Sequence, residues 1–250
     1  MAPLPRTPSL RLDGRRALVS GAGRGIGLAI AAALAEAGAA VTLMARTAGE
    51  IEPAASAMGG EALVLDVTDS AAFAQAMAAR PGYHIFVNNA GTARHASFLD
   101  VTQADYDAVM GLNLRAAFFA AQAVARGMVR DGLAGSIINV SSQMAHVGGP
   151  DRTVYCASKA GLEGLTRAMA IDLGGHGIRV NTLCPTFTRT PLTAPFFERP
   201  GFTQWALSRI RLGRFAEVTD MMGPAVFLAS DAAAMVTGSA LMVDGGWTAG

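Results

Sequence analysis

The sequence has little of what marks several special classes of protein. Its 250 residues include only two cysteines, too few for a disulfide framework, so we expect a reducing, cytoplasmic location. The formal net charge is +1 and the arginines are scattered without a basic stripe, which predicts no nucleic-acid partner. Charged residues such as Glu36 and Asp231 interrupt the apolar stretches, so we expect no membrane-spanning segment.

A resident metal ion is not expected either. The four histidines lack the ligand spacing of a zinc site: His84, His95, His146 and His176. Residues 1–10 contain three prolines and no apolar core. This amino terminus therefore predicts a loose tail and not a signal peptide.

About half of the residues are hydrophobic, and short apolar runs alternate with longer segments of helical length and composition. The expected strands are Arg16–Ser20, Ala40–Ala45, Ala62–Asp66, His84–Asn88, Ser136–Ser141, Ile178–Leu183 and Ala240–Val243. The expected helices include Gly25–Ala37, Ser70–Ala79, Arg115–Arg130 and Thr153–Leu173. Nearly continuous apolar strands that alternate with helices indicate βαβ units and a buried parallel sheet. We predict one α/β domain over residues 11–250, a Rossmann-type, doubly wound, seven-stranded parallel sheet with helices on both faces.

The stretch at about residues 185–214 departs from this alternation. It contains four prolines and several aromatic residues, including Phe196 and Trp205. An insertion of this kind late in an α/β domain is typical of a substrate lid. The alternative is an apolar flap that packs on the body of the protein or on another subunit.

A glycine-rich loop follows the first expected strand and leads directly into a helix. Its residues are Gly21, Gly23, Arg24, Gly25, Ile26 and Gly27. Small residues let the backbone approach a pyrophosphate, and the helix amino terminus supplies N–H donors and positive potential. We therefore predict a dinucleotide site at this loop.

The end of the second expected strand indicates which dinucleotide binds. An acidic residue there suits the ribose 2′-hydroxyl of NAD, whereas arginine suits the 2′-phosphate of NADP. The sequence has Arg46 at this turn and no carboxylate, and Arg24 could add a second charge. We predict that NADP(H) is favoured over NAD(H). The alternative is that Arg46 is a solvated turn residue and both cofactors bind.

Tyr155 and Lys159 are four residues apart in an expected helix, so their side chains lie on one face. A nearby ammonium lowers the pKa of a phenol, and a tyrosine tuned in this way can exchange a proton with a substrate oxygen. The pair predicts acid–base chemistry, although the same spacing is common on helix surfaces.

Further motifs follow in order along the chain. They are the loop glycines Gly21, Gly25 and Gly27, then Asp66-Val67, Asn88-Asn89-Ala90-Gly91, Asn113, Ser141-Ser142, Tyr155 with Lys159, Pro185 with Thr188 or Thr190, and Asp244-Gly245-Gly246. With these motifs, residues 11–250 resemble the short-chain dehydrogenase/reductase family. Thr186 stands where the family usually has glycine, so the loop shape there is less certain.

The resemblance implies a single mechanism, the interconversion of a secondary alcohol and a ketone by hydride transfer. Tyr155 would be the general acid or base, and Lys159 would lower its pKa and hold the nicotinamide ribose. Ser142, thirteen residues before the tyrosine, would bind the substrate oxygen, with Ser141 as a structural hydroxyl. Asn113 would hold a water of a proton relay.

The resemblance also implies cofactor contacts and an assembly. The implied contacts beyond the glycine loop and Arg46 are Asp66, Val67, Asn88, Ala90, Gly91, Tyr155, Lys159, Pro185, Thr186 and Thr188. The implied assembly is a homotetramer whose dimer interface uses the helices Arg115–Arg130 and Thr153–Leu173.

The substrate is indicated only by polar residues near the expected pocket. They are Arg94, His95, Gln143, His146 and Arg152. Two guanidiniums able to hold a carboxylate predict a polar small molecule, such as a sugar, polyol or hydroxy acid. The aromatic lid favours the alternative, a 3-oxoacyl-thioester reductase. A catalytically silent redox sensor is the alternative of another class, and the presence of all four catalytic residue types disfavours it.

Overall fold

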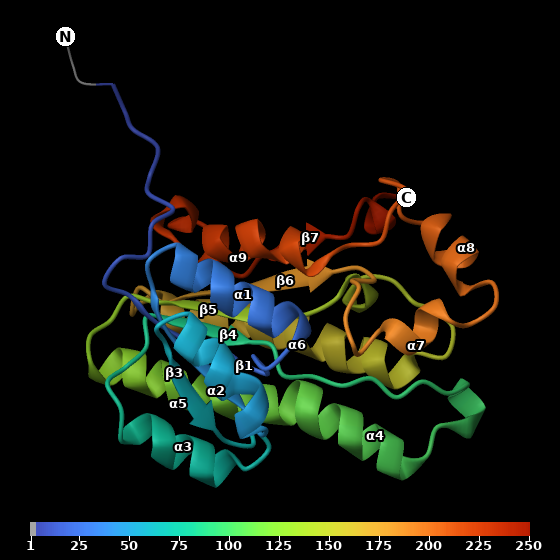
Figure 1. Ribbon diagram of the computed structural model, residues 1–250, viewed down its shortest axis with the longest axis horizontal. Coiled ribbons are helices and arrows are strands. Elements are labelled where there is room, and N and C mark those ends of the chain that lie inside the picture. Colours follow the sequence, from blue (N-terminus) through green and yellow to red (C-terminus); the bar gives the residue numbers. More distant parts are fainter. Residues whose placement is uncertain (1–3) are drawn as a thin grey trace.

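The computed structural model describes residues 4–250, which form a seven-stranded parallel sheet with helices on both faces (Figure 1). The strand order is β3-β2-β1-β4-β5-β6-β7. The strands are β1 Arg16–Ser20, β2 Ala40–Ala45, β3 Glu61–Val64, β4 Ile85–Asn88, β5 Ser136–Val140, β6 Arg179–Pro185 and β7 Ala240–Val243. The predicted doubly wound α/β fold is confirmed, and the winding reverses between the neighbouring strands β1 and β4.

The observed strands agree with the prediction along most of their length and differ at their ends. β1, β2 and β7 have the predicted bounds, whereas β3 starts one residue earlier and ends two residues earlier. β4 and β5 are buried along their whole length, as expected of central strands. β3 and β7 form the edges of the sheet and are partly exposed, so burial on both faces holds only for the centre.

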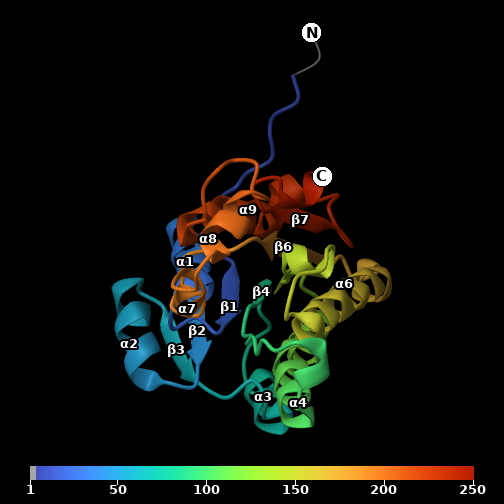
Figure 2. The ribbon, with the colours of Figure 1, turned by 90° about the vertical axis from the view of Figure 1, so that its right-hand side faces the viewer.

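Helices cover both faces of the sheet. They are α1 Gly25–Glu36, α2 Ala48–Ala57, α3 Ser70–Ala78, α4 Gln103–Met110, α5 Ala117–Arg130, α6 Thr153–Gly174, α7 Ala194–Phe197, α8 Phe202–Leu207 and α9 Met222–Ala229. Side chains of α1, α2 and α9 pack on one face, and those of α3, α5 and α6 pack on the other (Figure 2). Alternation along β1 places Leu18 in one core and Val19 in the other.

One helical run, Gln103–Arg130, combines α4, a π-helical turn at Gly111–Ala116, and α5. By length and composition this run could cross a membrane, which the sequence analysis did not expect. Half of its most apolar window is buried inside the fold, which is typical of a core helix that packs on a sheet. The π-helical turn also explains why α5 begins two residues later than predicted.

Residues 185–214 contain α7 and α8, which lie beyond the carboxyl end of β6 (Figure 1). Their aromatic side chains pack on one another and on Trp247 near the carboxyl terminus, with the Phe187 and Trp247 ring centroids 5.5 Å apart. Residues 185–214 therefore pack on the body of the protein, as in the alternative of an apolar flap. Their function as a substrate lid stays a prediction. At the other terminus, residues 4–10 are exposed and leave the body of the protein (Figure 1), and residues 1–3 of the predicted tail lie outside the described residues.

Candidate active site

A large pocket lies at the carboxyl ends of the strands, next to the place where β1 and β4 adjoin. Its wall is built from the segments that follow β1, β2, β3, β4, β5 and β6. Open α/β sheets bind ligands in the crevice at such a topological switch point. The structure brings nearly all of the predicted site residues together here, with four exceptions described below.

The glycine loop after β1 leaves no space for a side chain at its helix end. A Cβ atom at Gly27 would lie 2.4 Å from both the Asn89 Nδ2 atom and the Gly21 carbonyl oxygen. Gly21 and Gly25 have φ angles of +62° and +58°, a region that favours glycine. Asn89 Nδ2 donates to the carbonyl oxygens of Ser20 and Gly21, at 3.0 and 3.1 Å. The result is a bare, fixed backbone in front of α1, which is what a pyrophosphate requires.

Two arginines lie beside carboxylates at the end of β2 and in the glycine loop. Arg46 Nη1 is 3.7 Å from Asp66 Oδ2, and Arg24 Nη1 is 3.8 Å from Glu50 Oε1. Burial raises the pKa of Asp66, but hydrogen bonds from Thr68 and the charge of Arg46 outweigh it, so the net pKa is lowered. Both ion pairs are long and exposed, so each contributes little to stability and leaves its guanidinium available to an anion.

Tyr155 and Lys159 lie on α6 and both line the pocket. Lys159 Nζ donates to the Val140 carbonyl oxygen at 2.7 Å and lies 5.8 Å from the centroid of the Tyr155 ring. Burial lowers the pKa of Lys159 to about 8, so its amine is still mostly protonated at neutral pH.

The expected lowering of the Tyr155 pKa by Lys159 is not found in this geometry. Burial raises the pKa of Tyr155, and the opposing groups are the Ser142 hydroxyl and Arg152. Desolvation dominates because the phenol is enclosed and the Lys159 ammonium is turned toward a backbone carbonyl. Tyr155 is therefore protonated, which suits a proton donor.

Two serines follow one another at the end of β5, and their hydroxyls have different neighbours. The Ser142 hydroxyl adjoins Tyr155 and donates to Gln143 Oε1 at 2.8 Å. The buried Ser141 hydroxyl adjoins Cys184 and has no hydrogen-bond partner among residues 4–250. Ser142 is thus the serine beside the tyrosine, in agreement with the choice made from sequence spacing.

Asn113 lies on the π-helical turn, outside the pocket wall, and connects two segments that form this wall. Its Oδ1 accepts from the Thr92 N–H at 2.8 Å, and its Nδ2 donates to the Thr92 carbonyl oxygen at 2.9 Å. The same Nδ2 donates to Ser158 Oγ on α6 at 3.1 Å. These contacts hold the segment after β4 against the helix of Tyr155. The side chain therefore has a positioning role, and the expected role of Asn113 in holding a relay water stays a prediction.

Asn88 was predicted to contact the cofactor, and the structure places it in the interior instead. Its Nδ2 donates to the Ala117 carbonyl oxygen and to Asn139 Oδ1, both at 3.0 Å. Because successive side chains of a strand point to opposite faces, Asn88 faces α5 and Asn89 reaches the glycine loop.

Arg94 and His146 were predicted to contact the substrate, and neither lines the pocket. Arg94 Nη1 is held on the surface by Asp105 Oδ1 at 2.7 Å. The His146 Nε2 atom points toward Glu163 Oε1, 3.6 Å away, behind the pocket. In both cases a carboxylate that is distant in sequence attracts the side chain, and motif position does not reveal it.

Arg152 lines the substrate end of the pocket, as predicted, and is only 7% exposed. Its Nη1 donates to the Pro150 carbonyl oxygen at 2.7 Å, and its guanidinium carbon lies between 5.2 and 5.8 Å from the ring centroids of Phe187, Phe196 and Trp205. No carboxylate among the described residues lies within ion-pair distance of it. The pocket therefore contains a buried cation without a protein counter-charge.

Gln143 and His95 complete this end of the pocket, as predicted. Burial, with the positive charges of Arg152 and Arg199, lowers the pKa of His95 to about 4, so the imidazole is neutral at physiological pH. Its ring centroid lies 6.1 Å from that of Tyr155 and 4.9 Å from that of Phe196. His95 is therefore a neutral imidazole beside Tyr155.

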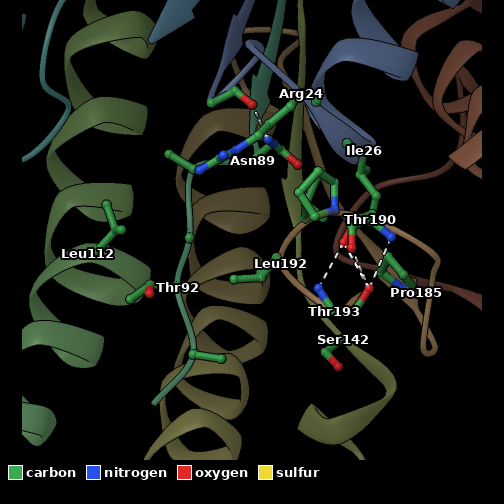
Figure 3. Close-up of a pocket in the computed structure, with 18 of the residues that line it drawn as sticks. Arg24, Ile26, Asn89, Thr92, Leu112, Ser142, Pro185, Thr190, Leu192 and Thr193 are labelled. Atoms are coloured by element: carbon green, nitrogen blue, oxygen red, sulfur yellow. Dashed lines mark hydrogen bonds between the residues drawn. The ribbon is translucent and has the colours of Figure 1, made fainter. Parts of the chain in front are cut away.

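Some lining residues lie outside the predicted site: Thr92, Leu192 and Thr193 (Figure 3). Asn89 from the motif after β4, Thr190, which was the alternative to Thr188, and Phe196 from the predicted lid also line the pocket. Thr193 Oγ1 donates to the Thr188 carbonyl oxygen at 2.6 Å, and the Thr190 N–H donates to Thr193 Oγ1 at 3.0 Å. These bonds fold the chain after β6 back over the pocket. The threonine-rich run before α7 was the available signal for this turn.

The predicted residues of the same segment, Pro185, Thr186 and Thr188, are also in the wall. Thr186, at the position where glycine was expected, is buried, and its hydroxyl has no hydrogen-bond partner in the described part of the chain.

Comparison with known proteins decides the family. A family model described as Enoyl-(Acyl carrier protein) reductase matches residues 21–248. The chain belongs to the short-chain dehydrogenase/reductase family. It is 44% identical over 241 residues to D-erythrulose reductase of Gallus gallus, covering 96% of this chain and 98% of that protein. It is 43% identical to L-xylulose reductase of Bos taurus, with coverage of 96% and 99%.

A solved structure shows the same similarity in three dimensions. The gluconate 5-dehydrogenase from Burkholderia cenocepacia J2315, in complex with NADP and tartrate, has a TM-score of 0.93 to this dehydrogenase/reductase. The two are 38% identical, and the match covers 96% of this chain and 98% of that one. The chain is thus an NAD(P)-dependent oxidoreductase that acts on CH–OH donors, as predicted.

Proposed function

We propose that this short-chain dehydrogenase/reductase interconverts a secondary alcohol and a ketone in a sugar or polyol, with NADP(H) favoured over NAD(H). The observation that carries the proposal is the polar end of the pocket beside Tyr155, formed by Gln143, His95 and Arg152. Relatives named for D-erythrulose and L-xylulose support a polyhydroxylated substrate. The acyl-thioester alternative has less support, because the aromatic flap packs mainly on itself and on Trp247.

The residues present fit a dinucleotide. The glycine loop offers a close-packed backbone in which a Cβ at Gly27 would collide with its neighbours, and Asp66, Val67, Ala90 and Gly91 continue the same wall. When bound, the nicotinamide supplies the hydride. Pro185, Thr186 and Thr188 would enclose its ring end, and Lys159 would hold its ribose.

Proton transfer and orientation belong to the side chains. In reduction, the protonated Tyr155 hydroxyl donates its proton to the substrate oxygen, and in oxidation the phenolate accepts one. Ser142 donates a second hydrogen bond to that oxygen and stabilises its developing charge. Lys159 favours the phenolate that remains after transfer, and Asn113 keeps the segment after β4 against α6.

Turnover by a tyrosine variant tests the chemistry. Tyr155→Phe should lower kcat/KM by about 10²–10⁴-fold on any active substrate, because it removes the proton donor and nothing else. Tyr106→Phe, at an exposed position on α4, is the matched control and should behave as wild type. A Tyr155→Phe enzyme that keeps near wild-type turnover refutes the mechanism, and a wild type that binds NADPH but reduces no sugar ketone supports the sensor alternative.

The cofactor preference rests on Arg46 and Arg24, which lie in the pocket wall. Arg46→Asp should lower the preference for NADPH over NADH by about 10–100-fold, the value of a hydrogen bond between charged groups. Arg6→Asp, in the exposed tail, is the control for the change in charge. An unchanged ratio of the two kcat/KM values would show that both cofactors bind and that Arg46 is a solvated turn residue.

A hydroxy acid is the second candidate substrate, because Arg152 is a buried cation without a protein counter-charge. Arg152→Met should raise KM for the keto acid derived from gluconate by about 10–100-fold and change KM for neutral ketoses much less. Equal effects on both substrates would mean that Arg152 supports the pocket only by packing.

The homotetramer and the cytoplasmic location stay proposals. Exposed apolar side chains on α5 and α6 support a helical interface: Phe118, Phe119, Val129 and Ile171. Light scattering should give a particle of about four times 25.7 kDa, and a monomer-sized particle would remove the proposal.

A further inference from the structure

Three side chains with metal-binding atoms meet behind the active site, outside the pocket wall. His146 follows the short turn after Ser142, Glu163 lies one helical turn beyond Lys159 on α6, and Cys184 precedes Pro185 on β6. Cys184 Sγ is 3.3 Å from Glu163 Oε1 and 3.7 Å from His146 Nε2. His146 Nε2 is 3.6 Å from the same Glu163 oxygen. Motif spacing does not predict this group, because the three positions are far apart in the chain.

The environment of Glu163 calls for a cation. Glu163 is 4% exposed, and among the described residues its only ion-pair partner is His146. Its Oε2 atom accepts a hydrogen bond from Thr182 Oγ1 at 3.0 Å, and its Oε1 atom accepts one from the Cys184 thiol at 3.3 Å. A buried carboxylate is costly unless a positive charge faces it. The nearby Lys159 ammonium interacts with Glu163 through its charge but forms no ion pair with it, because Nζ donates to the Val140 carbonyl oxygen. The neutral hydroxyl and thiol that contact the carboxylate directly supply no charge, so a cation bound there would be its direct partner.

The spacing of the three atoms matches a small, tetrahedral ion. The three separations of 3.3, 3.6 and 3.7 Å form a nearly equilateral triangle. In a tetrahedral zinc site with bonds of roughly 2.0–2.3 Å, the ligand atoms lie about 3.3–3.8 Å from one another, which is the range of these three separations. The ion would lie slightly out of the plane of the three atoms and leave its fourth position open.

Access and proton balance are also satisfied. The side chain of His146 is 32% exposed, so it provides a route from solvent to the two buried ligands. In the free site the Cys184 thiol donates to Glu163 Oε1 at 3.3 Å, so Cys184 carries its proton. Binding replaces the thiol proton, which is released to solvent, and requires the His146 tautomer with its proton on Nδ1.

We propose that His146 Nε2, Glu163 Oε1 and Cys184 Sγ form a binding site for Zn²⁺ or a similar soft divalent cation, with solvent as the fourth ligand. The ion takes no part in hydride transfer. It joins the segment after β5, α6 and β6, the three elements that carry Ser142, Lys159 and Pro185, and so fixes the back wall of the active site.

Cadmium is a direct probe, because a thiolate bound to Cd²⁺ gives an ultraviolet charge-transfer band that oxygen and nitrogen ligands do not give. Reduced, chelator-treated wild type should bind one equivalent of Cd²⁺ with this band, and Zn²⁺ should displace it. Cys184→Ser should lose the band, and Cys156→Ser, which removes the other free thiol, should keep it. A band that survives in Cys184→Ser, or no band in wild type, overturns the proposal.

A second variant separates binding from folding. His146→Asn changes the one ligand that reaches the surface, so the buried core is left intact. Zn²⁺ should raise the Tm of wild type in a concentration-dependent way. The apparent affinity for Zn²⁺ obtained from this dependence should be at least tenfold weaker for His146→Asn than for wild type. Equal affinities for Zn²⁺ in the two proteins would mean that the metal binds elsewhere.

Discussion

The buried ammonium of Lys159 should make this protein less stable at neutral pH than a variant without it. Burial lowers the pKa of Lys159 from 10.5 to about 8, and the side chain is 5% exposed, so solvent screens little of this effect. A shift of about 2.5 units corresponds to about 3 kcal/mol at 1.36 kcal/mol per unit. Lys159→Met keeps the length of the side chain and removes the charge.

The net effect is smaller than the pKa shift alone implies. The variant loses the hydrogen bond from the charged Nζ to the Val140 carbonyl oxygen, which is worth about 2 kcal/mol. We therefore expect Lys159→Met to be inactive and about 1 kcal/mol more stable than wild type at pH 7. For a domain of this size, that difference raises Tm by about 2–4 °C.

The pH dependence gives this prediction its sign. Between pH 8 and 10.5 the folded state binds fewer protons at Lys159 than the unfolded state, so wild-type stability rises with pH through this window. The burial cost is fully present below pH 8. The advantage of Lys159→Met should therefore be largest below pH 8 and should shrink as the pH approaches 10.5.

Denaturant unfolding of both proteins from pH 7 to pH 10.5 measures this difference. Lys159 is the only lysine in the chain, so no other lysine contributes to the pH dependence of stability. The tyrosines also titrate in this range, but both proteins contain them. Reductive ¹³C-methylation would label only Lys159 and the terminal amine, and the Lys159 signal should titrate near pH 8. A variant less stable than wild type at pH 7, or a stability difference independent of pH, refutes the reasoning.

Three further outcomes follow from the same structure. Gly27→Ala should abolish dinucleotide binding measured by fluorescence, because its Cβ would lie 2.4 Å from two neighbours, whereas Gly49→Ala, with open space around it, should bind normally. Titration with a thiol reagent should modify the partly exposed Cys156 in the native protein and the fully buried Cys184 only after unfolding, since burial raises the pKa of Cys184 to about 12. Arg94→Ala should leave KM for every substrate unchanged in steady-state assays, because its guanidinium is held by Asp105 outside the pocket.

The fold could be predicted because its signals are local and repeated. Each strand is a short apolar run, and each crossover helix follows within a few residues, so seven independent segments indicate the same architecture. The uncertain parts were the ends of elements, where hydrogen bonds from neighbours decide the boundary. The π-helical turn at Gly111–Ala116 is one example, because its Asn113 is hydrogen-bonded to Thr92 and Ser158, which are distant in sequence.

The candidate site was predicted well where a backbone position decides the contact. The glycine loop, Ser142, Tyr155 and Lys159 are fixed by the element that carries them, and all line the pocket. Side chains with long reach were harder to place. Arg94 and Arg152 are both arginines near the expected pocket, but Arg94 finds Asp105 on the surface and Arg152 finds only aromatic rings and a carbonyl oxygen.

The two asparagines at the end of β4 also show that a motif does not reveal where each of its side chains lies. Asn88 and Asn89 belong to one motif, yet strand alternation sends Asn88 to Asn139 in the core and Asn89 to the glycine loop. A motif states that both amides are needed and does not state which one supports the fold. The contacts assign them: Asn88 joins β4 to β5, and Asn89 holds the cofactor loop.

The composition of the chain also indicates that Lys159 has a special function. The chain has 20 lysine and arginine residues, and only one of them is lysine. Arginine stays charged in proteins, so it serves at exposed ion pairs and at Arg152, where a permanent cation suits an anionic or polar ligand. The position beside Tyr155 has another requirement under the proposed mechanism, in which a proton that leaves the tyrosine must be replaced at physiological pH. A lysine whose pKa is about 8 remains a cation in most molecules and can still give up its proton, a combination that arginine does not offer. The burial that makes Lys159 costly to the fold is thus the same burial that brings its pKa into the range where it can exchange protons.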